Sequence, residues 1–436
     1  MTVSDSVPSV GSGVGLGLGP GPDPGPRPGL DSGSDPGSGS VLTCPVRHDV
    51  ALEPDPFMSR MRTEAPIARV RMPYGEGDCW LVTRYADVQT VTSDRRFSRA
   101  ALIGRDFPRI TPAPIAQSEA INLMDPPSLN RVRRLIIKAF TTPQVEALRP
   151  WTQQTVDRLL DTMVASGSPA DITHHLADQL PLLTICELLD IPEEDRPRLR
   201  EWAMAMMSMS AADETSAVAA KAGLRAYFTE LTAARRRTPG DDLISALATA
   251  RVGDEMLDEA ELAVLAMLLV VTGHDTTTYD ISNVIYTLLT HPAQLGQVRA
   301  RPELLPQALE ELLRFIPFRQ GVGIPRVALV DVDFDGVVIK AGDTVHVSYL
   351  TANRDDLVYD RPDELDFERP DPVAHMAFGY GSHHCLGSHL ARMVLQVAIG
   401  TAITRFPGLR LAVPAEEVRW NTVSIWRYPL ALPVAW

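Results

Sequence analysis

The strongest constraint on the fold is one long helical pattern over residues 258–290. Asp258, followed three residues later by Glu261, resembles a capping box, which starts many helices. A continuous helix of this length would span about 48 Å at 1.5 Å per residue. The segment 262–271 is apolar on nearly every side, so we expect this helix to run through the core.

The middle of this helix carries residues that do not suit an apolar core. Gly273 costs about 1 kcal/mol inside a helix. His274, Asp275 and Thr276 follow it, and buried polar groups must be satisfied or serve a purpose. These residues are therefore candidates for a functional role.

The rest of the chain is also mostly helical. Strand signals are few: residues 80–83, a hairpin at Asp335-Gly336 followed by 337–339, residues 345–348 and residues 428–434. The predicted fold class is mainly α, an α+β chain with a minor sheet. The other helical patterns cover 128–140, 143–165, 180–190, 195–208, 214–236, 241–250, 306–316 and 386–405.

Residues 1–43 differ in composition from everything that follows. The first 40 residues hold 11 of the 29 Gly, with seven Pro and eight Ser. Such a segment buries too little apolar surface to offset its chain entropy, so it is predicted to be a disordered tail. Residues 44–436 show no second linker and no internal repeat, which predicts a single domain.

Charge and cysteine content exclude several classes of protein. A net charge of −14 argues against nucleic acid as the main partner. Four Cys are too few for a disulfide scaffold and suit a reducing cytoplasm. No apolar run approaches the roughly 20 residues of a membrane span, and no signal peptide is visible. We therefore expect a cytoplasmic protein without a membrane anchor.

The segment 375–392, HMAFGYGSHHCLGSHLAR, gathers groups that could bind a transition metal. Structural zinc needs four ligands at fixed spacings, and Cys385 has no CxxC partner. His384 adjoins Cys385, and neighbouring residues rarely point at one small ion. A zinc site is thus disfavoured, and a set of surface histidines around an inert Cys leaves the glycines unexplained.

The glycines favour a flat ligand. Gly379, Gly381 and Gly387 surround Cys385 and would let the backbone approach such a ligand closely. The helix predicted from Leu386 onward would stabilise a thiolate with its N-terminal amides. One thiolate beneath the iron of a planar macrocycle fits this arrangement.

At this point the chain resembles the cytochrome P450 family, specifically its soluble bacterial, actinomycete-like members. The pattern Phe378-Gly379-x-Gly381-x-His383-x-Cys385-Leu386-Gly387 is similar to the family's haem-binding loop and is highly specific. The resemblance covers roughly residues 45–436. Further landmarks in the family's order are Asp125-Pro126-Pro127, Gly273 to Thr277, Glu311-x-x-Arg314, Ala352 to Asp355 and Phe367 to Arg369.

The resemblance implies a triangular helical prism with a long central helix, and one haem b with Cys385 as its axial iron ligand. Many members carry a His at the position of Leu129, so one donor to the haem propionates is expected to be missing. The other residues implied at the cofactor are His383, Arg133 and Arg326 at the propionates, with Phe378, Gly379 and Gly387 in the loop.

Two further sets follow from the resemblance. Asp275 and Thr276 are implied to deliver protons to bound oxygen, although a Thr bonded back to a helix carbonyl is the alternative. Thr272 replaces the usual small residue and adds a hydroxyl. Glu311, Arg314 and Arg369 are implied to form a buried network that supports haem incorporation without taking part in the chemistry.

The implied function is a monooxygenase that inserts one oxygen atom into a small organic substrate, by resemblance a secondary metabolite. Electrons would come from an external ferredoxin and its reductase, with NAD(P)H, to a monomeric enzyme. A basic helix with Arg131, Arg133, Arg134 and Lys138 is a candidate docking site for the ferredoxin. Two alternatives use the same iron: oxidative coupling of aromatic substrates without oxygen insertion, and a haem sensor.

Substrate contacts are expected from residues 99–123, the helix pair near 200–220, the central helix, residues 317–323 and the turn near 421–426. The second of these regions holds a Met-rich stretch, Met204 to Met209, which suits either irregular ligands or ordinary packing.

Overall fold

The computed structural model describes residues 41–44, 51–110, 120–207, 214–319, 322–370, 374–421 and 425–436. The predicted tail lies outside these residues as far as residue 40. Its last two residues, Leu42–Thr43, form strand β1 and pair with β2 (Ile67–Arg71), so the sheet begins before the predicted boundary at residue 43.

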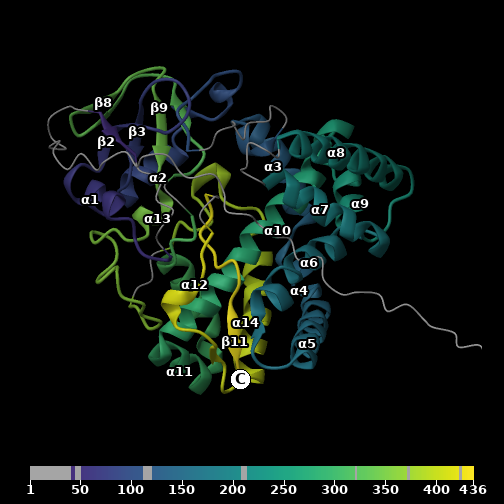
Figure 1. Ribbon diagram of the computed structural model, residues 1–436. Helices are drawn as coiled ribbons and strands as arrows, with labels where there is room; N and C mark the ends of the chain where they lie inside the picture. Colours follow the sequence, from purple (N-terminus) through teal and green to yellow (C-terminus); the bar gives the residue numbers. More distant parts are fainter. Residues whose placement is uncertain are drawn as a thin grey trace, which may run out of the picture. The chain divides into compact units, whose positions relative to one another are not determined.

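The long helix is confirmed as α10, Glu259–Thr290, and its predicted start is correct. The Asp258 carboxylate accepts from the Glu261 amide at 2.7 Å, and the Glu261 carboxylate accepts from the Asp258 amide at 3.0 Å. Most of its residues are buried, and α10 packs against α6 (Leu180–Leu188), α8 (Glu214–Arg237) and α14 (Ser388–Arg405) (Figure 1). By length and composition α10 could cross a membrane, but these contacts make it a core helix.

The other predicted helices are present within a few residues of their expected bounds. Helices α1, α2 and α11, of nine residues each, and the four-residue α13 were not predicted from the sequence. The bounds are α1 Pro56–Glu64, α2 Tyr85–Ser93, α3 Ser128–Ala139, α4 Thr142–Ala147, α5 Arg149–Ser166, α7 Arg196–Met207, α9 Leu243–Thr249, α11 Pro292–Ala300, α12 Leu305–Phe315 and α13 Tyr349–Ala352.

Three boundaries correct the sequence prediction. The helix expected over 143–165 is two helices, α4 and α5, which meet at Leu148 because Pro150 lacks the N–H that would continue the ladder. The helix after Cys385 begins at Ser388 and not at Leu386. Of the strand expected over 428–434, only Pro433–Ala435 (β11) lies in a ladder.

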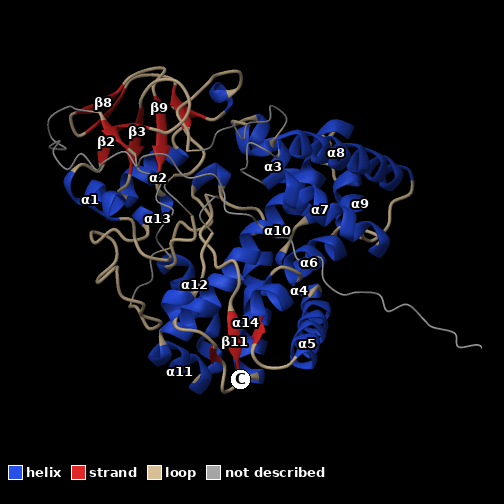
Figure 2. Ribbon diagram, viewed as in Figure 1, coloured by secondary structure: helices blue, strands red, loops and turns tan. Residues whose placement is uncertain are grey.

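The main sheet has six strands in the order β1-β2-β3-β9-β6-β4 and gathers at one end of the described structure, with helices around the rest (Figure 2). The predicted hairpin is β7 (Val332–Phe334) and β8 (Val337–Ile339), with Asp335 and Gly336 both at positive φ. A third sheet joins β10, β11 and β5. The remaining strands are β3 Cys79–Val82, β4 Phe97–Ser98, β5 Ala170–Asp171, β6 Arg326–Ala328, β9 Thr344–Val347 and β10 Arg410–Leu411.

Candidate active site

A large cavity lies between α10, the start of α14 and the loop that carries Cys385. Its empty volume is about 1820 Å³. This figure includes the open solvent at the mouth of the cavity. The side chain of Cys385 is exposed, and what it is exposed to is this cavity.

The loop before α14 is folded by its own backbone. The Cys385 amide donates to the Phe378 carbonyl at 2.9 Å, and the His384 amide donates to the Gly381 carbonyl at 3.0 Å. Gly379 and Gly381 adopt φ angles of +74° and +73°, which L side chains rarely adopt. Gly387 has an ordinary φ of −84°, and a Cβ there would lie 4.0 Å from the Cys385 sulfur. Two of the three glycines thus allow the turn, while the third lies close to the sulfur.

The surroundings of Cys385 act on its thiol in opposite directions. Cys385 faces the cavity but lies deep within the protein, and this desolvation raises its pKa, whereas the Gly387 backbone amide and the charges of Arg133 and Arg392 lower it. Arg133 donates to the His384 carbonyl at 2.9 Å, and Arg392 lies 4.5 Å from the Phe378 ring centroid. The groups that favour a thiolate are therefore fixed to the loop itself.

Positive charge gathers at the edge of the cavity near His383. Burial, and then the charges of Arg99, Arg326 and Arg133, lower the pKa of His383 to about 2, so its imidazole is neutral. Arg326 is 2% exposed, and neither of its terminal nitrogens has a hydrogen-bond partner among the described residues. Buried guanidinium groups need anionic partners. The cluster therefore fits a flat cofactor that carries carboxylates at its edge, as haem does.

Arg99 is a member of this cluster that the motif analysis missed. The Asp125 carboxylate, in the Asp-Pro-Pro landmark, accepts from the Arg99 backbone amide at 2.9 Å and from the Ser98 hydroxyl. The Arg99 side chain donates to the Asn122 carbonyl at 3.0 Å. The sequence shows an arginine directly after the segment of strand β4, but no local pattern indicates that its side chain lines the cavity.

The structure separates the two predicted proton-delivery residues. Thr276 lines the cavity, and its hydroxyl donates to the Thr272 carbonyl at 3.0 Å. Asp275 is buried, is not part of the cavity wall, and lies with Oδ1 3.1 Å from His274 Nδ1. The two residues therefore face different surroundings, because neighbouring residues on a helix point about 100° apart.

Asp280 is an acid that the sequence did not single out, although it lies one helical turn after Thr276. It is buried on the cavity wall, and burial raises its pKa to about 7.

The structure also explains the presence of Gly273 inside α10, because a Cβ at this position would lie 2.7 Å from Ile185 Cδ1 of α6. The glycine that weakens α10 thus lets α6 pack closely against it.

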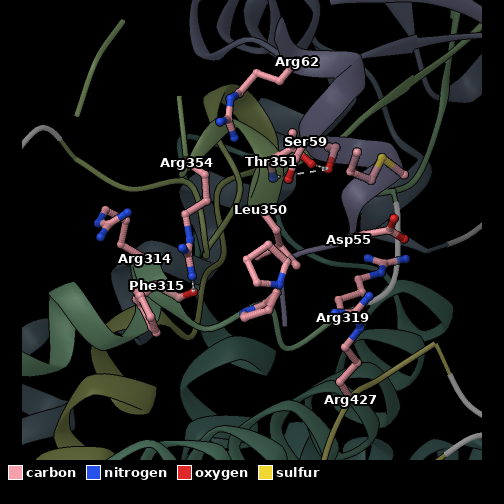
Figure 3. Close-up of a pocket in the computed structure, with 14 residues that line it drawn as sticks. Asp55, Ser59, Arg62, Arg314, Phe315, Arg319, Leu350, Thr351, Arg354 and Arg427 are labelled. Atoms are coloured by element: carbon pink, nitrogen blue, oxygen red, sulfur yellow. Dashed lines mark hydrogen bonds between the residues drawn. The ribbon is translucent and has the colours of Figure 1, made fainter. Parts of the chain in front are cut away.

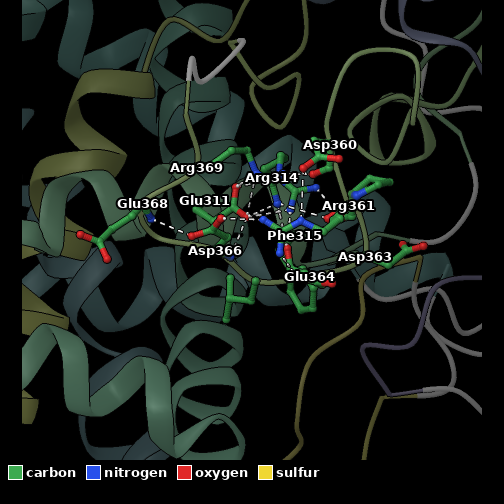
Figure 4. Close-up of polar contacts among 12 residues, drawn as sticks. Glu311, Arg314, Phe315, Asp360, Arg361, Asp363, Glu364, Asp366, Glu368 and Arg369 are labelled. Atoms are coloured by element: carbon green, nitrogen blue, oxygen red, sulfur yellow. Dashed lines mark hydrogen bonds and ion pairs between the residues drawn. The ribbon is translucent and has the colours of Figure 1, made fainter.

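Glu311, Arg314 and Arg369 form one buried ion-pair network (Figure 4). Arg314 pairs with Glu311 through two bonds of 2.7 and 2.8 Å, and Arg369 Nη2 approaches Glu311 at 3.0 Å. Arg314 also donates to the carbonyls of Asn353 and Pro362 at 2.9 and 2.8 Å. The network ties α12 to the following loops and lies apart from the cavity wall.

Only some of the regions expected to contact the substrate line the cavity. The cavity wall includes residues from the 99–123, 317–323 and 421–426 segments and from α10, but none from the described part of 200–220. Met209 and the side chains of Met204, Met206 and Met207 lie outside the described residues.

Acidic side chains from other segments pair with part of the positive charge of the basic helix α3. Arg131 pairs with Glu261, and Arg134 pairs with Glu255 at 3.1 Å. The side chain of Lys138 is not described. In the described part of the chain, no group of three or more His, Cys, Asp or Glu side chains could hold a metal ion.

Known proteins share this arrangement. A sequence profile described as Cytochrome P450 matches residues 203–409. Nocardicin C N-oxygenase from Nocardia uniformis subsp. tsuyamanensis is 46% identical over 90% of this chain and 98% of its own. Mycinamicin IV hydroxylase/epoxidase from Micromonospora griseorubida is 44% identical over 85% and 92%. The crystal structure of cytochrome P450mel 107F1, with biaryl coupling reactivity, has a TM-score of 0.87 and 63% identity over 91% of this chain and 100% of that one.

A cysteine loop beneath a large cavity, with cations for the edge of a flat cofactor, defines a haem-thiolate protein. The chain belongs to the cytochrome P450 family. It is a monooxygenase with haem b as its cofactor, and it receives electrons from a ferredoxin and its reductase, with NAD(P)H as their source. When bound, the haem supplies the activation of dioxygen, and a thiolate ligand favours cleavage of the O–O bond.

Proposed function

We propose that this monooxygenase hydroxylates or epoxidises a small organic secondary metabolite, within a single haem domain over residues 44–436. The main support is that Cys385 and Thr276 line the same cavity, so that the proposed ligand loop and the central helix face one another across it. Relatives named for acting on nocardicin C and mycinamicin IV support a substrate of this class.

Cys385 is the proposed axial ligand, and the cationic edge residues are the proposed propionate partners: His383, Arg133 and Arg326. Phe378, Gly379 and Gly387 shape the loop beneath the macrocycle. Glu311, Arg314 and Arg369 hold α12 and its loops in place for haem incorporation.

Thr276 is proposed to orient the proton donor. Its own proton is engaged by the Thr272 carbonyl, so its oxygen offers lone pairs to the cavity and can accept a hydrogen bond there. Asp275 lies behind the wall beside His274 and is proposed to connect ordered water at Thr276 with the outside.

Substitution of Cys385 tests the central assignment. Cys385→Ser should lose the thiolate-type Soret band of the reduced CO complex, because an alcohol is a weaker donor than a thiolate. Cys186→Ala, which removes another free thiol on α6, should keep that band. A thiolate spectrum in Cys385→Ser would refute the proposal.

The enzyme is proposed to work as a cytoplasmic monomer that docks a separate ferredoxin. All four cysteines are free, which suits a reducing compartment. Because Arg131 and Arg134 are paired with acids, electrostatic docking at α3 would depend on few free charges. A ferredoxin panel, compared by reduction rate at two salt concentrations, tests the partner, and sedimentation tests the oligomeric state.

Oxidative coupling of aromatic substrates is the second candidate. It is favoured by one observation, the 63% identity to a P450 with biaryl coupling reactivity. Labelled dioxygen separates the two candidates, because a monooxygenation product carries the label and a coupled product does not.

A further inference from the structure

Arg319 lies on the cavity wall with no carboxylate paired to it among the described residues, and Tyr349 is the group whose charge acts on it. It makes no ion pair and no hydrogen bond with the described residues, apart from one backbone bridge to Trp426, and its buried Nε is unpartnered. Burial lowers its pKa to about 10, so the guanidinium stays charged at neutral pH. Asp55 lines the smaller cleft on the other side of Arg319 (Figure 3), but no ion pair joins them.

Aromatic side chains support this guanidinium from one side. Its central carbon lies 5.1 Å from the Trp426 ring centroid, within the range of a cation–π contact. Phe318 stacks on Trp426, with 5.8 Å between centroids and 7° between rings. Phe318, Arg319 and Trp426 all line the cavity, so they form one aromatic and cationic wall.

The balance of charge in the cavity is positive. Arg99, Arg133 and Arg319 line it, against a single acid, Asp280, among the described lining residues. The proposed haem carboxylates would pair with the cluster that acts on His383, to which Arg99, Arg326 and Arg133 contribute. Arg319 instead contacts the Trp426 ring, so its charge is available to bind another ligand.

We propose that Arg319, backed by Trp426, binds the ionised hydroxyl of a planar aromatic substrate, so that the substrate class is acidic phenols and enols. This inference rests on the proposed function and narrows its substrate. A ligand that fills the cavity would take water away from this guanidinium, which is costly without an acceptor, and the guanidinium fork can bind an anionic oxygen through charge-assisted bonds. The flat rings of Phe318 and Trp426 suit a flat substrate.

A matched pair of ligands tests the proposal on the ferric holoenzyme. 4-Hydroxycoumarin is ionised at neutral pH, whereas 4-methoxycoumarin has the same ring system without the acid. Affinities are measured by the Soret shift and by calorimetry. The wild type should bind the acid about ten- to a hundredfold more tightly. Equal affinities, or a preference for the ether, overturn the proposal without any variant.

Variants then locate the charge. Arg319→Gln should remove the preference for the acid and leave the affinity for the ether within about twofold, while Arg319→Lys should keep part of the preference. Arg134→Gln removes the same charge from the exposed face of α3 and should change neither affinity. If Arg319→Gln keeps the preference, or only loosens haem while the ratio of affinities stays constant, Arg319 is not the anchor.

Different results would refute the haem-thiolate function and the substrate class. Absence of the thiolate-type spectrum in the wild type would refute the haem-thiolate function itself. An intact thiolate spectrum with no preference for the acid would remove only the substrate class.

Discussion

The Thr276 hydroxyl donates its proton to the Thr272 carbonyl, 3.0 Å away and one turn earlier on α10. This bond is common for Thr in helices, and it leaves the oxygen free to accept from the cavity side. The same contact that could be purely structural therefore sets the polarity that Thr276 presents to a substrate.

Thr276→Ala should lower the product formed per electron consumed by about tenfold or more, because positioned proton transfer is lost. The remaining electrons should appear as hydrogen peroxide. Thr276→Ser should keep most of the yield. Thr272→Ala removes another cavity hydroxyl, which bonds to Leu268, and should have little effect. Equal yields for Thr276→Ala and wild type would make the hydroxyl structural only.

Glu311→Gln should lower the free energy of unfolding by about 3–5 kcal/mol, because it leaves Arg314 and Arg369 buried without their shared carboxylate. Urea unfolding measures the change. Glu364→Gln is the matched control: its exposed carboxylate pairs with Arg361 at 2.6 Å, and its loss should cost less than about 1 kcal/mol. Similar losses in both variants would contradict the burial argument.

Gly381→Ala should destabilise the protein by more than about 2 kcal/mol. Its φ of +73° already costs an L residue about 1–2 kcal/mol, and its Cβ would lie 2.5 Å from the Thr92 carbonyl oxygen. Gly296→Ala, in open space on α11, should stabilise the protein by up to about 1 kcal/mol. Thermal unfolding and haem retention report both effects, and an unchanged Gly381→Ala protein would refute this reading of the loop.

His346 should make stability depend on pH. Both imidazole nitrogens face backbone carbonyls, of Pro108 at 2.8 Å and Gly323 at 3.2 Å, and burial lowers the pKa of His346 from 6.5 to about 4. The unfolded chain therefore takes up a proton before the folded one does. The contribution of His346 is complete above pH 6.5 and falls as pH drops toward 4, by about 2 kcal/mol at pH 5.

His346→Gln provides the comparison, because an amide can donate to the Pro108 carbonyl and does not titrate. Between pH 8 and pH 5 the wild type should lose about 2 kcal/mol more unfolding free energy than this variant. His389→Gln, at an exposed site, should follow the wild type. Parallel curves for wild type and His346→Gln would show that the buried imidazole is not the titrating group.

Predictions from local pattern succeeded where neighbours in the sequence decide the structure. The capping box at Asp258, the hairpin at Asp335-Gly336 and most helix spans depend on contacts within a few residues. The same is true of the turns at Gly379 and Gly381, whose positive φ angles the glycines make possible. Pairing of Glu311 with Arg314 is likewise an i, i+3 contact on one helix.

Other features depended on distant parts of the chain. Nothing local shows that Asp125 holds the backbone of Arg99, or that α6 brings Ile185 against Gly273. Which of Asp275 and Thr276 faces the cavity likewise depends on the side of α10 along which the cavity lies.

The sequence by itself determined the turn around Cys385, the central helix and the family, since these lie in contiguous motifs that local geometry preserves. Only the tertiary structure decided which charges share the cavity. Arg99, Asp280, Arg319 and Trp426 come from four separate segments. Whether a guanidinium meets a carboxylate or an aromatic ring depends on which segments pack together, and packing is a property of the whole fold.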